Sequence, residues 1–172
     1  MSKLEDIAEQ IAGESKPPVH LWQPEHVGEI DIEIDETGTW FHEGGQIRRP
    51  ELVRLFASIL WFEEGAHFLV TPVEKLKITV EDVPFIIQTA EYVEQSWVVT
   101  TNALQRLIVS DQHPVKLRPF QGQPIPYVNV RYDLWARISR GVYYQWVEQA
   151  LEQGDSEAPE LSSGEYVFSL SA

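Results

Sequence analysis

The amino-acid sequence predicts an α+β fold, in which a mostly β chain carries two helices. Apolar and polar residues alternate in several short segments, most clearly at 28–35, where three isoleucines alternate with acidic residues. This period is typical of a half-buried strand. Two longer stretches, 50–60 and 133–151, instead repeat their apolar residues at the spacing of a helix. With 172 residues, 43% of them hydrophobic, the chain can bury a core in one domain or in two small ones.

The N-terminal part of the chain predicts a short helix and then a strand meander. Residues 1–16 have an amphipathic pattern that stops at Gly13, before two prolines. After the strand at 28–35, a Thr-Gly pair turns the chain into a second strand at 40–42, and two glycines turn it again.

The segment that begins at Pro50 predicts the first long helix, because proline is tolerated best in the first turn. Its apolar residues fill one broad face: Leu52, Val53, Leu55, Phe56, Ile59 and Leu60. The opposite face holds Trp61, and an exposed tryptophan there indicates a second layer or a partner.

The centre of the chain predicts further strands, which a second helix follows. The strands are expected at 68–70, 75–81, 85–92, 97–101, near Leu107 and at 126–131. The helix is expected over 133–151, with two tryptophans on its apolar stripe and Arg137 and Arg140 on the other side. A polar, acidic connection at 154–164 precedes a last short strand at 166–168.

The positive charges of the chain are concentrated in its middle. The whole carries 13 Lys+Arg against 27 Asp+Glu, a net charge of −14, yet residues 44–147 hold 11 of those bases and only 10 acids. Two short runs, 48–54 and 131–140, each contain three arginines and one acid. Because the guanidinium fork suits phosphate and carboxylate, these runs predict an anion site. The net charge argues against sequence-independent binding of DNA or RNA.

Both predicted helices are entered through the same short pattern. Arg49-Pro50-Glu51-Leu52 and Arg131-Tyr132-Asp133-Leu134 share an arginine, any residue, an acid and a leucine. The acid lies where the helix dipole favours it, and the arginine lies beside unpaired backbone N–H groups. The pair suggests an internal repeat whose two helix entrances face one ligand, although a match this short also arises by chance.

The composition narrows the classes of function. No stretch approaches the roughly 20 apolar residues that cross a bilayer, and the N-terminus has no apolar signal core, so we expect a cytoplasmic protein. The absence of cysteine removes disulfides, thiolate nucleophiles and zinc–cysteine sites. Phosphate-binding loops, nucleophile elbows and histidine pairs at metal spacing are also missing. We therefore expect no metal, no cofactor and no catalytic residues.

Several ordered motifs between residues 22 and 150 resemble one bacterial family. They are Gly38-Thr39-Trp40-Phe41-His42, Ile47-Arg48-Arg49, Leu69-Val70-Thr71-Pro72-Val73-Glu74, Val80-Glu81-Asp82-Val83-Pro84-Phe85, Thr101-Asn102, and Pro126-Tyr127-Val128 with Arg131, Arg137 and Arg140. The family is known as domain of unknown function 1285. The resemblance implies two α+β domains with an internal duplication, the second loosely like a pleckstrin-homology fold. It also implies a link to signal transduction and a nucleotide-type ligand at the domain interface.

These observations together predict the domain organisation and the function. We expect a flexible N-terminal extension at 1–19, an N-terminal α+β domain at 20–74, a β-rich C-terminal domain at 75–153 closed by a long helix, and an acidic extension at 154–172. The expected function is the non-catalytic binding of a small, nucleotide-like anion at the domain interface.

The predicted ligand-binding residues combine positive charge, an aromatic ring and polar groups. They are Arg49, Thr71, Glu74, Asn102, Tyr127, Arg131, Arg137 and Arg140. An extended 126–131 segment would place Tyr127, Asn129 and Arg131 on one face, as a ring for stacking, an amide for base edges and a cation for phosphate. Each predicted residue also has an ordinary structural interpretation, as a turn residue, a helix cap or half of an ion pair.

Two alternative functions use other residues. A protein-interaction adaptor would dock a basic partner through Trp61 and the acidic ends of the chain. A magnesium-dependent phosphohydrolase would use Glu74, Glu81 and Asp82 around a metal ion.

Overall fold

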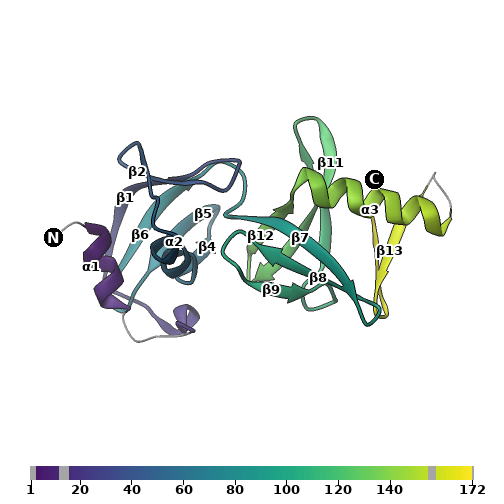
Figure 1. Ribbon diagram of the computed structural model, residues 1–172. Coiled ribbons are helices and arrows are strands. Elements are labelled where there is room, and N and C mark those ends of the chain that lie inside the picture. Colours follow the sequence, from purple (N-terminus) through teal and green to yellow (C-terminus); the bar gives the residue numbers. More distant parts are fainter. Residues whose placement is uncertain (1–2, 12–15, 155–157, 172) are drawn as a thin grey trace. The chain divides into compact units, whose positions relative to one another are not determined.

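The computed structural model describes residues 3–11, 16–154 and 158–171, and it divides the chain into two compact units. Unit 1 is Met1–Pro84 and unit 2 is Phe85–Ala172 (Figure 1). The predicted boundary after residue 74 therefore lies ten residues too early. The strand that begins at Glu74 pairs with two strands of unit 1, and its hydrogen bonds keep it there.

The described residues of unit 1 form two helices, a short 3-10 turn and six strands. In chain order they are α1 (Lys3–Gln10), η1 (Val19–Leu21), β1 (His26–Ile34), β2 (Trp40–His42), β3 (Gly45–Gln46), α2 (Pro50–Ala57), β4 (Leu60–Glu63), β5 (Ala66–Val70) and β6 (Glu74–Val80). The six strands form one sheet in the order β3-β2-β1-β6-β5-β4.

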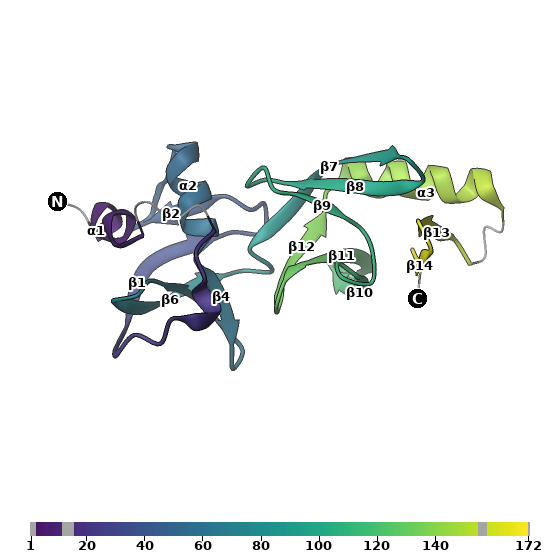
Figure 2. The ribbon, with the colours of Figure 1, turned by 90° about the horizontal axis from the view of Figure 1, so that it is seen from below.

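The core of unit 1 lies on the sheet face that carries the two helices, which Figure 2 shows on the same side of the sheet. Phe56 of α2 is fully buried, and the centre of its ring lies 6.3 Å from that of Trp40 on β2. Ile7 of α1 is also fully buried. The apolar stripe predicted for the first helix therefore faces the core, as its helical spacing indicated.

In the part of unit 2 that the structure describes, there are eight strands and one helix. They are β7 (Phe85–Val93), β8 (Ser96–Thr101), β9 (Arg106–Ile108), β10 (Val115–Phe120), β11 (Gln123–Arg131), β12 (Leu134–Ile138), α3 (Arg140–Gln153), β13 (Glu160–Ser163) and β14 (Tyr166–Ser169). Six strands form one sheet in the order β10-β11-β12-β7-β8-β9, and β13 and β14 form a separate hairpin.

The two six-stranded sheets have the same topology, so the predicted duplication is confirmed. In each unit, two antiparallel three-stranded meanders are joined by a parallel pairing of the first and sixth strands, which are β1 with β6 and β7 with β12. The units differ in where a helix interrupts or follows the six strands. Helix α2 follows the third strand of unit 1, and helix α3 follows the sixth strand of unit 2.

The core of unit 2 is centred on one tryptophan of α3. Trp146 is fully buried, and its ring centre lies 5.9 Å from that of Trp97 on β8 and 5.1 Å from that of Phe168 on β14. The helix runs along β7 (Figure 1), and Gln145 donates a hydrogen bond to the backbone oxygen of Ala90 at 3.0 Å. The α3 helix and the β13–β14 hairpin thus close the same side of the second sheet.

Helix α3, predicted at 133–151, begins seven residues later than predicted, at Arg140. Residues 134–138 form β12, in which buried Leu134, Ala136 and Ile138 alternate with half-buried Trp135 and Arg137. Tyr132 has a φ of 47°, which turns the chain back from β11. The helix starts after Ser139, whose hydroxyl accepts a hydrogen bond from the backbone N–H of Val142 at 3.3 Å. The prediction that both patterns lie at helix N-termini is therefore wrong, because the second, at 131–134, forms the turn between β11 and β12.

Helix α2, predicted at 50–60, is shorter than predicted and does not contain Trp61. It ends at Ala57, and the next residues form β4, which pairs with β5 through a tight turn at Glu64 and Gly65. Both turn residues have positive φ, at 51° and 78°. Such a turn favours a hairpin over a continued helix.

Residues 3–11 and 158–171, which lie in the predicted extensions, contain regular structure and buried side chains. Ile11, just after α1, is 1% exposed, and Leu161 and Phe168 of the C-terminal hairpin are buried as well. The predicted helix stop at Gly13 and residues 155–157 of the predicted acidic connection lie outside the described residues. Within the described part of the chain, no helix is both long and apolar enough to cross a membrane.

Candidate functional site

The predicted site residues belong to both units. Arg49, Thr71 and Glu74 lie in unit 1, and Asn102, Tyr127, Arg131, Arg137 and Arg140 lie in unit 2. Within unit 1, Thr71 and Glu74 lie next to each other, because the Thr71 hydroxyl accepts the backbone N–H of Glu74 at 3.0 Å.

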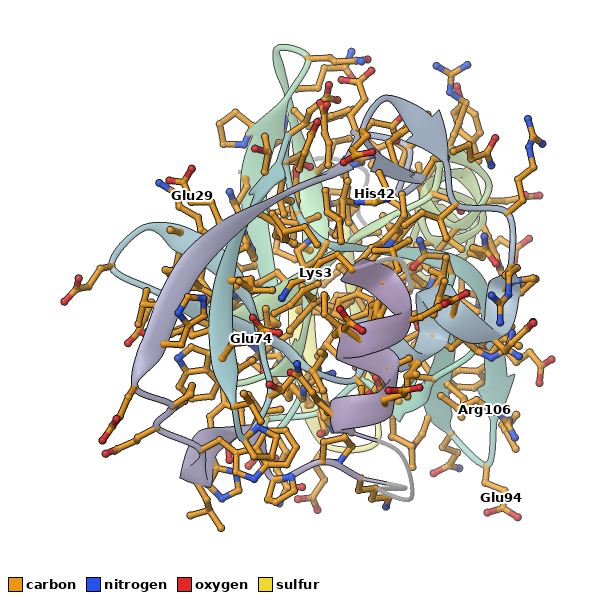
Figure 3. The ribbon with its side chains drawn as sticks, turned by 90° about the vertical axis from the view of Figure 1, so that its left-hand side faces the viewer. Lys3, Glu29, His42, Glu74, Glu94 and Arg106 are labelled. Atoms are coloured by element: carbon orange, nitrogen blue, oxygen red, sulfur yellow. The ribbon has the colours of Figure 1, made fainter. Side chains whose placement is uncertain are left out.

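Glu74 and Thr71 are held by helix α1. The Lys3 ammonium donates to both carboxylate oxygens of Glu74, at 2.7 and 2.9 Å, and Figure 3 shows the two side chains facing each other. The Gln10 amide donates to the same carboxylate at 2.8 Å and accepts the Thr71 hydroxyl at 2.6 Å. Glu74 is only 3% exposed. The predicted pair of ligand residues therefore already has partners from the N-terminal helix.

The contacts of Glu74 determine its ionisation. Burial would raise the pKa of the carboxyl, but the hydrogen bonds from Lys3 and Gln10 and the charges of Lys3 and His26 outweigh burial and hold the pKa below its usual value. Glu74 is therefore a buried carboxylate stabilised in its charged form.

This pKa predicts how the stability of unit 1 depends on pH. A carboxyl whose pKa is lowered by folding stabilises the folded state above its unfolded pKa of about 4.5, and this contribution is lost as the pH falls through the folded pKa. When the pH is lowered from 5, the free energy of unfolding, measured in urea, should therefore fall less for Glu74→Gln than for the wild type. Equal pH profiles would contradict the prediction.

Arg49 is the N-cap residue of α2, but its side chain makes no capping hydrogen bond. Its Nε lies 3.8 Å from a carboxylate oxygen of Glu51, and both side chains are about two thirds exposed. Exposed pairs of this kind contribute about 0–1 kcal/mol. Arg49 therefore remains a solvent-exposed cation at a helix end.

Asn102 and Arg140 have different environments. The side-chain oxygen of Asn102 accepts the backbone N–H of Ile86 at 3.1 Å, and the backbone N–H of Asn102 donates to the backbone oxygen of Ile86 at 2.9 Å. The side chain and the backbone of Asn102 together connect the end of β8 to β7. Arg140 is the exposed first residue of α3.

Tyr127 and Arg137 come together on one face of the second sheet. The backbone register pairs Tyr127 of β11 with Lys116 of β10 on one side and with Arg137 of β12 on the other. Residues two positions along each strand point to the same face. This cation–aromatic face therefore consists of Lys116, Arg118, Phe120, Gln123, Ile125, Tyr127, Asn129, Trp135 and Arg137.

Each cation on this face lies over an aromatic ring. The guanidinium carbon of Arg137 is 3.8 Å from the centre of the Phe120 ring, and that of Arg118 is 4.7 Å from the centre of the Tyr127 ring. The Lys116 ammonium is 5.8 Å from the ring centre of Trp135. Such distances are typical of cation–π interactions, which fix the cation over the ring.

The ring of Tyr127 supports a cation from within the fold. The residue is 0% exposed, so its ring lies under Arg118 and not at the surface where a base would stack. Half-buried Phe120 and Trp135 and exposed Lys116 form the outer part of the face.

Arg131 does not belong to the cation–aromatic face. The pairing of β11 with β12 shifts by one residue after Asn129, so that Arg131 lies opposite Leu134. Its guanidinium carbon is 5.9 Å from the centre of the Phe85 ring. Burial lowers the pKa of Arg131, although the neighbouring Tyr132 partly opposes this shift. The predicted set of Tyr127, Asn129 and Arg131 on one strand face is therefore wrong for Arg131.

The three strands of the face contain no acidic residue. Strands β10, β11 and β12 carry four basic side chains and no aspartate or glutamate, in a chain whose net charge is −14. The face is thus a local concentration of positive charge and aromatic surface.

Sequence reasoning missed Lys116, Arg118 and Phe120, because no strand was predicted at 115–120. Leu117 and Pro119 do not form an apolar alternation, and proline is tolerated in a strand at an edge of the sheet, as here. The period-2 pattern Lys116, Arg118 and Phe120 was the signal that could have identified these residues.

The carboxylates of the hydrolase alternative are spread along one strand. Glu74 begins β6 and Glu81 follows its end, so seven residues of extended chain separate them, about 23 Å. Glu81 accepts the backbone N–H of Glu36 at 2.7 Å. Glu74 and Glu81 cannot share one metal ion across this distance. Among the described residues, no group of three His, Cys, Asp or Glu side chains could hold a metal ion.

The fold defines a class of two-domain α+β proteins in which one six-stranded sheet topology occurs twice. Residues 17–83 match the N-terminal domain, and residues 84–170 the C-terminal domain, of the family described as domain of unknown function DUF1285. The chain belongs to the DUF1285 family.

Two crystal structures of family members resemble this chain. The DUF1285 family protein from Silicibacter pomeroyi DSS-3 is 36% identical, with a TM-score of 0.89 over 100% of this chain and 96% of that chain. The DUF1285 family protein from Shewanella baltica OS155 is 28% identical, with a TM-score of 0.56 over 69% of this chain and 91% of that chain. No curated protein matches the sequence.

Proposed function

We propose that the protein binds a small anion that carries a planar ring, of the nucleotide class, on the cation–aromatic face of β10, β11 and β12. The observation that carries this proposal is that three cations lie over three aromatic rings on one strand face whose strands contain no acidic residue. The ligand is bound without being chemically changed.

Arg118 is the residue that holds a phosphate or another anionic group of the ligand. The Tyr127 ring supports the flat side of its guanidinium, which leaves the N–H groups at the edge free to donate to oxygen atoms. Because this stacking orients the guanidinium before binding, less conformational entropy is lost when the ligand arrives. Exposed Lys116, on the same strand, adds a second positive charge.

Trp135 and Phe120 supply aromatic surface for the ring of the ligand. Both are half-buried, so each ring is fixed by the fold yet reaches the surface. Stacking of a base on an aromatic side chain contributes about 1–3 kcal/mol. A small ligand suits this face better than a polynucleotide, because the net charge of −14 repels a long polyanion.

The position of β10 supports a role in signalling from this face, which we place in the cytoplasm as part of the same proposal. The strand lies at the edge of its sheet, and the backbone N–H of Val115 donates to the Tyr166 hydroxyl of β14 at 2.9 Å. A ligand that orders β10 would therefore also stabilise the C-terminal hairpin. A protein partner that binds this hairpin would then respond to the ligand.

The proposal predicts that a nucleotide raises the melting temperature of the full chain. A ligand at 100 times its dissociation constant stabilises the folded state by about 2.7 kcal/mol, which corresponds to a shift of a few degrees. The measurement is a thermal melt in a panel of mono- and dinucleotides at fixed salt, with inorganic phosphate as the control for non-specific anion effects.

A pair of arginine variants locates the binding. Arg118→Met should raise the dissociation constant of the nucleotide that gives the shift at least tenfold, which corresponds to about 1.4 kcal/mol of binding free energy. Arg106→Met is the matched control, because Arg106 is exposed on β9, at the opposite edge of the same sheet. The proposal fails if no nucleotide acts beyond phosphate, or if the Arg118 variant binds like the control.

A further inference from the structure

A hollow lies on the face of the first sheet that points away from α1 and α2. Val27 of β1, Lys75 of β6 and Val70 of β5 are register partners on adjacent strands, so their side chains share one face. Leu76, the residue after Lys75, is buried on the opposite face, which belongs to the core. The segment that contains η1 crosses the hollow and contributes to its wall.

The walls of the hollow combine aromatic and aliphatic side chains with four polar ones, those of His20, Gln23, Glu63 and Lys75. Its volume is about 330 Å³, at the lower end of the range of ~300–1,000 Å³ found for small-molecule sites. Trp22 follows η1 and Trp61 lies on β4, and both are half-buried at its wall. Exposed Val27 and buried Val70 also line it. Trp61 was predicted as an exposed anchor on a helix, but it lines this hollow.

The hollow also contains one ion pair. Lys75 and Glu63 both line it, and their side chains form a salt bridge. The Lys75 ammonium lies 4.5 Å from the centre of the Phe68 ring, which holds it in place. Both members of the pair keep some exposure, 23% for the Lys75 side chain and 39% for that of Glu63.

This chemistry indicates what the hollow can accept. The ion pair is neutral as a whole, so a ligand with a net charge would leave one charge in the hollow without balance. A zwitterion adds an anion for Lys75 and a cation for Glu63 at the same time. The two tryptophans and the valines provide a place for an apolar or aromatic body attached to that head group.

We propose that the hollow under η1 binds a small zwitterion with an apolar side chain, of the free amino-acid class. Its carboxylate contacts Lys75, its ammonium contacts Glu63, and its side chain lies between Trp22 and Trp61. This site is formed entirely by unit 1 and is independent of the anion site proposed for unit 2.

The test uses the full chain, phenylalanine as the probe, and titration calorimetry as the readout. N-acetylphenylalanine lacks the ammonium and phenethylamine lacks the carboxylate, so each single-charge analogue should bind at least tenfold more weakly than phenylalanine. If phenylalanine does not bind, or if either analogue binds as tightly, the proposal is overturned.

Variants of the same protein place the binding in the hollow. Lys75→Met and Trp61→Leu should each weaken phenylalanine at least tenfold. Lys77→Met is the matched control and should leave binding unchanged, because Lys77 lies two residues along the same strand but does not line the hollow. The analogue series on the wild type decides the proposal even if a variant fails to fold. Phenylalanine affinity that is equal in all three variants would overturn the location.

Discussion

Replacing Trp146 by alanine is expected to lower the free energy of unfolding of unit 2 by about 3–5 kcal/mol. The indole is fully buried between Trp97 and Phe168, so its removal loses the contacts of α3 with β8 and with β14 at once. The change is measured by urea unfolding, followed by circular dichroism.

Two further variants control this prediction. Tyr144→Ala, on the same helix but 62% exposed, should change the stability by less than about 0.5 kcal/mol. Trp146→Phe should cost less than Trp146→Ala, because a ring is kept and the indole N–H makes no hydrogen bond to any described residue. Equal losses for Trp146→Ala and Tyr144→Ala would contradict the assignment of Trp146 as the centre of the core.

Replacing Lys3 by methionine is expected to lower the free energy of unfolding of unit 1 by about 2–3 kcal/mol. Removing one partner of a buried ion pair costs about 3–5 kcal/mol, because the other charge stays buried. The value is reduced here, since the Lys3 side chain is 41% exposed and Gln10 still donates to Glu74. The measurement is urea unfolding at pH 7.

The matched control for this variant is Lys16→Met, which removes the same charge from an exposed position in the segment after α1. It should leave the stability nearly unchanged. Lys3→Arg should recover part of the loss, because a guanidinium also donates to a carboxylate. If Lys3→Met and Lys16→Met behave alike, the Lys3–Glu74 pair does not hold α1 in place.

Much of the fold could be predicted from periodicity alone. The alternation at 28–35 and 75–81 predicted β1 and β6, and the apolar face after Pro50 predicted the position of α2. The duplication was also predicted, although the short pattern that suggested it is not a structural repeat. What repeats is the order and direction of six strands, and this depends on pairing between residues far apart in the chain.

The errors arose where two periods fit the same residues. Leu134, Ala136 and Ile138 fit a strand, while Trp135, Ile138 and Val142 fit a helix, and the turn at Tyr132 and the cap at Ser139 decided between them. Sequence reasoning predicted a helical end for Trp61 for the same reason. Local spacing does not show where a hairpin turn will interrupt it.

The candidate site was only partly predictable. Tyr127 and Arg137 were expected to bind ligand, and their strands lie side by side, but Lys116 and Arg118 joined them only through the pairing of β10 with β11. Thr71 and Glu74 were expected to be free for a ligand, whereas helix α1 from the far end of unit 1 holds both. Neither contact could be read from neighbouring residues in the chain.

The most direct test of the proposed function is nuclear magnetic resonance of the six tryptophan indole N–H signals during titration with the nucleotide that raises the melting temperature. Trp135→Phe assigns one signal to the cation–aromatic face. We predict that the Trp135 signal moves in proportion to occupancy, that the buried Trp146 signal stays in place, and that Arg118→Met shifts the midpoint of this movement to at least tenfold higher nucleotide concentration. If the nucleotide binds saturably but the Trp135 signal does not move, this result would contradict binding on β10, β11 and β12.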